Sequence, residues 1–148
     1  MREINLLAVI GTGFWATLIM TWLAYWLKGI GLPKIDYAQW HAAQILPEGM
    51  ERGIGGWICG QVSHFLVGVV FALAYALWFA PNIDLPGWLL GIIFGAIFWA
   101  VVGIIYLPVV ERAGVLGLGR SKLLWLTDLI CRIIWGLILG IAYKVPTT

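Results

Sequence analysis

The chain has 148 residues, of which 62% are hydrophobic and 11% are charged, and its formal net charge is +2. Together with a mean hydropathy of +0.97, this composition excludes an ordinary water-soluble domain. The cations are too few and too dispersed to form the clustered basic face that nucleic-acid binding requires. We therefore expect a single integral membrane domain over residues 1–148, with the lipid bilayer as its surroundings.

Four apolar windows are long enough to cross a bilayer. Each exceeds the roughly 18 apolar residues that a hydrocarbon core about 30 Å thick requires. The predicted spans are Leu6–Leu27, Trp57–Phe79, Trp88–Val110 and Leu123–Tyr143. They occupy most of the chain and leave only short connections. The predicted fold class is an all-α membrane protein, a four-transmembrane-helix bundle.

The longest connection contains a fifth, shorter helix. Pro33 and Asp36 are helix start signals, the segment Tyr37–Leu46 is compatible with a helix, and Pro47 ends it. We expect this helix to lie along the membrane surface. Tyr37 and Trp40 would then sit at headgroup depth as an amphipathic anchor, with a binding role for these two residues as the alternative.

The distribution of Lys and Arg predicts the orientation. Four spans place both termini on one side and the loops Lys28–Gly56 and Glu111–Lys122 on the other. Six cations lie in the loops and only two near the termini. By the positive-inside rule, the loops are expected in the cytoplasm and both termini outside a cell (inner) membrane.

Small residues recur at every fourth position of the later spans. Lipid provides little hydrophobic drive for helix association, so close approach at small residues is a major source of packing energy. The predicted packing glycines are Gly60, Gly68, Gly91, Gly95, Gly136 and Gly140. His64 fills a gap in the ridge of the second span, and the ridge of the fourth span continues back to Arg132 and Asp128.

A weak internal repeat relates the two halves. The pattern Gly11-x-x-Phe14-x-Ala16 recurs as Gly91-x-x-Phe94-x-Ala96. His64, Gly68, Ala72 and Tyr75 align with Arg132, Gly136, Gly140 and Tyr143. Either the chain is a duplication about an axis along the membrane normal, or these are chance matches among residues common in membrane helices.

Asp128 and Arg132 are one helical turn apart within an otherwise apolar span. A charge at the centre of a membrane helix costs about 2.5–3.5 kcal/mol on insertion scales, so each should have a partner. Counting about 1.5 Å per residue from the loop-side ends places His64 and Asp128 roughly 10 Å and 9 Å deep. We predict an intramembrane polar cluster in which His64 lies close to Asp128, with Thr21 and Tyr106 near the same level.

Three roles are open for this cluster. It is a structural clasp if Asp128 neutralises Arg132 and His64 locks the bundle. It is a proton or ion relay if His64 changes charge beside a buried carboxylate. It is a binding site if Arg132 or His64 contacts a lipid phosphate, a quinone or a cofactor in a partner subunit.

Enzymatic chemistry is disfavoured. The chain lacks His-x-x-x-His and Glu-x-x-His spacings, and His41 would have to fold inward to serve as a second haem ligand beside His64. Cys59 and Cys131 lie singly within spans and are interpreted as packing residues. We therefore expect no catalytic residue, no metal site and no cofactor of this chain's own.

Three segments resemble a family. Residues 11–20 (GTGFWATLIM), 31–36 (GLPKID) and 64–75 (HFLVGVVFALAY) resemble the YagU-like group, small four-span prokaryotic membrane proteins of unknown function. The resemblance covers roughly the first half of the chain. It implies a prokaryotic multi-pass protein and implies no activity, cofactor or catalytic residue.

The expected function is that of a structural or accessory subunit of a larger membrane complex, such as a respiratory assembly, with other membrane subunits or further copies of the chain as partners. The motive is the absence of a soluble domain and of a converged catalytic set, together with helix faces rich in small residues and aromatics. One alternative is a proton-linked or small-solute transporter or channel that uses His64, Asp128 and Arg132. Another is a haem- or quinone-binding electron carrier.

Overall fold

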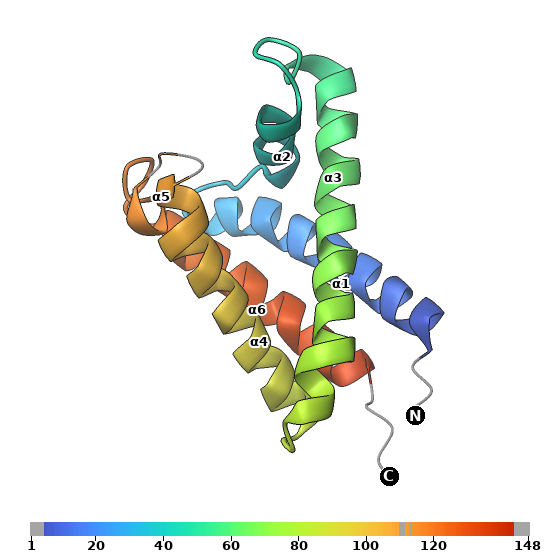
Figure 1. Ribbon diagram of the computed structural model, residues 1–148. Coiled ribbons are helices and arrows are strands. Elements are labelled where there is room, and N and C mark those ends of the chain that lie inside the picture. Colours follow the sequence, from blue (N-terminus) through green and yellow to red (C-terminus); the bar gives the residue numbers. More distant parts are fainter. Residues whose placement is uncertain (1–4, 110–111, 113, 144–148) are drawn as a thin grey trace.

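A computed structural model describes residues 5–109, 112 and 114–143 of the chain. Throughout these residues the regular structure is helical (Figure 1). The long helices are α1 (Leu6–Leu27), α3 (Gly53–Ala74), α4 (Gly87–Val101) and α6 (Leu124–Ala142). With their irregular extensions they form four segments long and apolar enough to cross a membrane. The predicted all-α fold with four spans is confirmed.

Two of the spans continue beyond their α-helices in irregular helical turns. A π-helical turn, Tyr75–Phe79, and a 3₁₀ turn, Ala80–Asn82, extend α3. A π-helical turn, Val102–Tyr106, and the short helix α5 (Leu107–Val109) extend α4. The second span begins at Gly53 rather than at the predicted Trp57, because its glycine-rich first turn is helical although it is not apolar. The predicted end of the third span, Val110, is outside the described residues.

The expected fifth helix is present as α2 (Tyr37–Ile45). Asp36 caps it by accepting a hydrogen bond from the backbone N–H of Gln39 at 3.1 Å. The chain leaves the helix at Leu46, which is extended as expected for a residue before proline. In Figure 1, α2 lies alongside the first part of α3.

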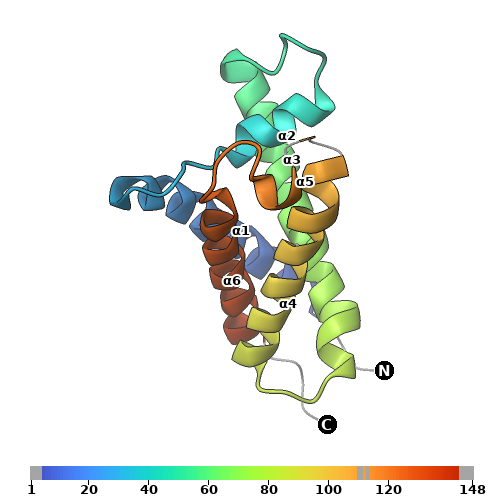
Figure 2. The same ribbon diagram turned by 90° about the vertical axis from the view of Figure 1, so that its left-hand side faces the viewer.

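The long helices pack as two pairs, α1 with α3 and α4 with α6, and the helices of the second pair are antiparallel. α4 and α6 run side by side, whereas α1 crosses α3 obliquely and also packs on α6 (Figures 1 and 2). α1 begins and α6 ends at one end of the molecule, and α2 and α5 lie at the other. The described parts of the two predicted loops therefore share one end.

Glycines set the contact between α4 and α6. A Cβ atom added to Gly91 or Gly136 would overlap the backbone carbonyl of the other residue, and one added to Gly95 would overlap the carbonyl of Arg132. Gly140 meets the carbonyl of Gly87 in the same way. The backbones thus touch at successive turns, as the glycine ridges predicted.

α1 and α3 meet with the same four-residue step. Gly13 faces Ala72, Thr17 faces Gly68, and Thr21 bonds to His64. In this pair a threonine side chain takes the place that a glycine backbone has between α4 and α6. On the remaining turn of the α3 ridge, Gly60 lies against the carbonyl of Ala38 in α2.

The structure disagrees with one match of the proposed repeat, that of Gly11 with Gly91. Gly11 has open space where a Cβ would stand, whereas Gly91 is packed against α6, so these two glycines are not equivalent. It is Gly13 that faces α3 as Gly87 faces α6. Gly11 and Gly13 differ by about 200° around the helix, and only the neighbouring helix decides which one is buried. Duplication itself stays a prediction.

Aromatic rings fill the space between α3 and the pair α4 and α6. Phe71 stacks on Phe98 with ring centroids 3.7 Å apart, and Tyr75 contacts Phe94 edge to face at 5.3 Å. Both phenylalanines of α4 also contact Trp135 of α6, which is only 1% exposed. This aromatic layer connects α3 and its extension with α4 and α6.

Gly91→Ala should lower the free energy of unfolding by about 1–3 kcal/mol, because the added methyl group meets the α6 backbone. Gly11→Ala is the matched control. It should be neutral or stabilise α1 by up to about 1 kcal/mol, since the site is open and alanine favours helix. Equilibrium unfolding in mixed micelles measures both, and equal effects would contradict the assigned packing.

Candidate functional site

The buried ion pair of α6 is the centre of the site. The Nε atom of Arg132 donates to Oδ2 of Asp128 at 3.0 Å, and the residues are 6% and 2% exposed. The guanidinium carbon lies 4.2 Å from the centroid of the Phe98 ring, so an aromatic face shields the cation. The predicted i, i+4 pairing is confirmed.

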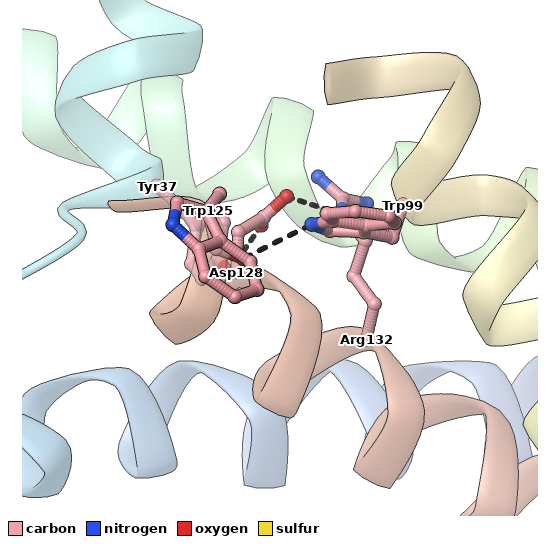
Figure 3. Close-up of polar contacts among 5 residues, drawn as sticks. All are labelled: Tyr37, Trp99, Trp125, Asp128 and Arg132. Atoms are coloured by element: carbon pink, nitrogen blue, oxygen red, sulfur yellow. Dashed lines mark hydrogen bonds and ion pairs between the residues drawn. The ribbon is translucent and has the colours of Figure 1, made fainter. Parts of the chain in front are cut away.

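Tyr37 provides the second partner of Asp128. Its hydroxyl donates to Oδ1 at 2.9 Å, so both carboxylate oxygens accept a hydrogen bond (Figure 3). Tyr37 is 2% exposed, which overturns its expected place as a headgroup anchor. Asp36 caps α2, and Tyr37 is the first residue of that helix. The hydrogen bond to Asp128 compensates the cost of burying the Tyr37 hydroxyl.

Burial, and then the negative charge of Asp128, raise the pKa of Tyr37 well above its usual value. The phenol therefore stays protonated at physiological pH and acts as a hydrogen-bond donor to a carboxylate that can only accept. Trp40 contacts the same ring edge to face at 6.0 Å, and the Arg120 guanidinium lies 5.5 Å from the Trp40 ring. Trp40 thus packs on Tyr37 and is itself in contact with Arg120 of the second loop.

His64 joins the site through this tyrosine. The imidazole stacks on the Tyr37 ring, with centroids 4.8 Å apart and planes within 4°. Its Nε2 is 3.0 Å from the hydroxyl of Thr21, which the sequence placed only near the same level. The sequence predicted that His64 lies close to Asp128. In the structure Tyr37 links the two, since its ring stacks on His64 and its hydroxyl donates to Asp128.

His41 does fold inward. It comes from α2, its Nδ1 lies 3.3 Å from the Ser63 hydroxyl, and its ring centroid is 5.3 Å from that of His64. In the described part of the chain, no group of three or more His, Cys, Asp and Glu side chains is placed to hold a metal ion. What the fold brings together is two imidazoles, one phenol and one ion pair.

A second polar contact ties α6 to α1, and the sequence patterns did not single it out. Trp135 donates through Nε1 to the Thr17 hydroxyl at 3.0 Å, and that hydroxyl donates to the Gly13 carbonyl at 2.8 Å. Thr21 likewise bonds back to the Thr17 carbonyl at 2.8 Å. The spacing of Gly13, Thr17 and Thr21 was the available signal, since it continues the small-residue ridge of α1.

Two further aromatic residues belong to the third span. Trp99 donates to the backbone carbonyl of Trp125 at 3.1 Å and so joins α4 to the start of α6 (Figure 3). Tyr106 is half-buried in the π-helical turn after α4. Its membership of the cluster stays a prediction.

Comparisons with models of protein families, with curated proteins and with solved structures find no match to this chain. The resemblance to the YagU-like group stays a prediction. What the site does must be argued from its own chemistry.

Removing one charge of the pair should destabilise the protein more than removing both. Asp128→Leu strands a buried guanidinium and should lower the free energy of unfolding by about 3–5 kcal/mol. Adding Arg132→Met should recover much of that loss. Arg52→Met is the control, because the Arg52 side chain is 82% exposed beside Glu51 and such a pair contributes at most about 1 kcal/mol. An additive double variant, measured by equilibrium unfolding, would contradict the pairing.

Proposed function

We propose that this multi-pass membrane protein is a structural or accessory subunit of a larger membrane complex. The observation that carries the proposal is the internal closure of the polar centre. Asp128, Arg132 and His64 are each at most 6% exposed, and Tyr37 and Arg132 take the two oxygens of the Asp128 carboxylate. With Tyr37 in place, the pair stabilises the bundle and presents no bare charge to a solute.

The outer surface supports the same role. Large aromatic side chains point away from the core, with Trp22 74%, Trp78 78% and Trp15 60% exposed. Tryptophan offers a large, rigid contact area at low entropic cost and recurs at protein interfaces. Lipid covers such a surface where no subunit does.

Photo-crosslinking in native membranes tests the proposal. A photoreactive amino acid at Trp22 of α1 or Trp78 beyond α3 should capture one discrete protein from only one of these faces, the other being covered by lipid. In mild detergent the same complex should migrate above the monomer. A lone monomer without protein crosslinks would contradict the proposal. So would proton flux through the purified chain in proteoliposomes that Asp128→Asn abolishes, since that result identifies a transporter.

We further propose that the loops are cytoplasmic and that both termini are outside a prokaryotic inner membrane. The support is the excess of Lys and Arg in the loop segments. Two exposed positions at opposite ends, Met50 and Asp84, allow a direct test in a Cys59→Ala background. On intact cells a membrane-impermeant maleimide should label Asp84→Cys and spare Met50→Cys. The opposite labelling would reverse the orientation.

A further inference from the structure

The seat of Tyr37 is built from side chains of two membrane helices. The His64 imidazole of α3 stacks on the Tyr37 ring, and Asp128 of α6 accepts a hydrogen bond from the Tyr37 hydroxyl. The occupant itself comes from neither helix, because Tyr37 belongs to α2 in the connection between the first two spans. The seat is therefore a site within the membrane domain that a loop residue fills.

Glycines in left-handed conformations flank α2. Gly31 has φ +92° before the helix, and Gly49 and Gly53 have φ +91° and +86° after it. Such positions are where a chain changes direction without strain, and hinges are often placed at them. These three glycines are the positions about which α2 would turn if it left α3.

The other buried side chains of α2 are small. Ala38 and Ala42 are 1% and 0% exposed, and the Ala38 carbonyl rests on Gly60. An alanine buries far less apolar surface than an aromatic ring. Tyr37 is consequently the side chain that anchors α2 most deeply.

We propose that the seat of Tyr37 is a ligand site for a hydroxylated aromatic ring, of the kind carried by phenols and hydroquinones, and that Tyr37 fills it as a built-in competitor. When α2 lifts, an incoming ring stacks on His64 and donates its hydroxyl to Asp128. Arg132 holds that carboxylate in position through the 3.0 Å contact.

The chemistry of the seat selects the ligand. A carboxylate accepts hydrogen bonds and donates none, so the ring must carry a hydroxyl rather than a carbonyl. The near-parallel stacking on His64 requires a flat ring instead of an aliphatic alcohol. The site therefore favours a hydroquinone over the corresponding quinone. This inference stands apart from the accessory-subunit proposal, because it needs no partner protein.

Chemical rescue tests the seat directly. Tyr37→Ala removes everything beyond Cβ, which is the shape of phenol, so phenol should raise the melting temperature of the full-length variant in a concentration-dependent manner. Benzene, which lacks only the hydroxyl, should bind at least tenfold more weakly. Equal rescue by the two compounds, or rescue by neither in a folded variant, would overturn the proposal.

Tyr37→Phe keeps the test decisive should Tyr37→Ala fail to fold. Its ring still fits the seat, but the internal competitor loses its bond to Asp128. The affinity for added phenol should therefore rise about 10- to 100-fold over wild type, the equivalent of a hydrogen bond to a charged group. Unchanged affinity would show that Tyr37 does not compete for the site.

A redox pair distinguishes the sources of the hydroxylated ring. Tetramethylhydroquinone should bind Tyr37→Phe at least tenfold more tightly than tetramethylquinone. If tetramethylhydroquinone also binds more tightly than phenol, the natural ligand is a hydroquinone, and the reverse order assigns the site to simple phenols. Equal binding of the hydroquinone and the quinone would contradict recognition through Asp128.

Discussion

The Asp128 carboxylate imposes the constraint on which the rest of the site depends. An ionised group inside a membrane domain must find its partners within the protein, since lipid tails supply none. Arg132 on the same helix takes one oxygen, and Tyr37 from a distant loop takes the other. The second bond has the larger structural consequence. It draws α2 into contact with the membrane helices and brings the Tyr37 ring onto His64.

The repeated four-residue contact between helices explains how these groups meet. On α3 the ridge passes from Gly68 to His64 to Gly60, and on α6 from Gly136 to Arg132 to Asp128. The outer positions, Gly60 and Asp128, both face α2, the first through the Ala38 carbonyl and the second through the Tyr37 hydroxyl. Two similar ridges thus converge below one loop helix.

Periodicity and composition predicted the spans and the glycine contacts, because both follow from local rules that each helix obeys by itself. They also found Asp128, Arg132, His64 and Thr21, which stand out chemically on buried ridges. They could not place Tyr37. Its burial depends on a loop folding back over a gap between helices, which no local pattern encodes, and aromatic residues near span ends more often face headgroups. The choice of Gly13 over Gly11 likewise depends on the neighbouring helix.

The central claim is that Tyr37 and Asp128 are energetically coupled across the loop and the fourth span. A double-mutant cycle with Tyr37→Phe and Asp128→Asn, measured by equilibrium unfolding, tests it most directly. A bond between a phenol and a buried carboxylate predicts a coupling free energy of about 1.5–3 kcal/mol. Additive effects of the two substitutions would contradict the account, because α2 would then be held in place by something other than the carboxylate.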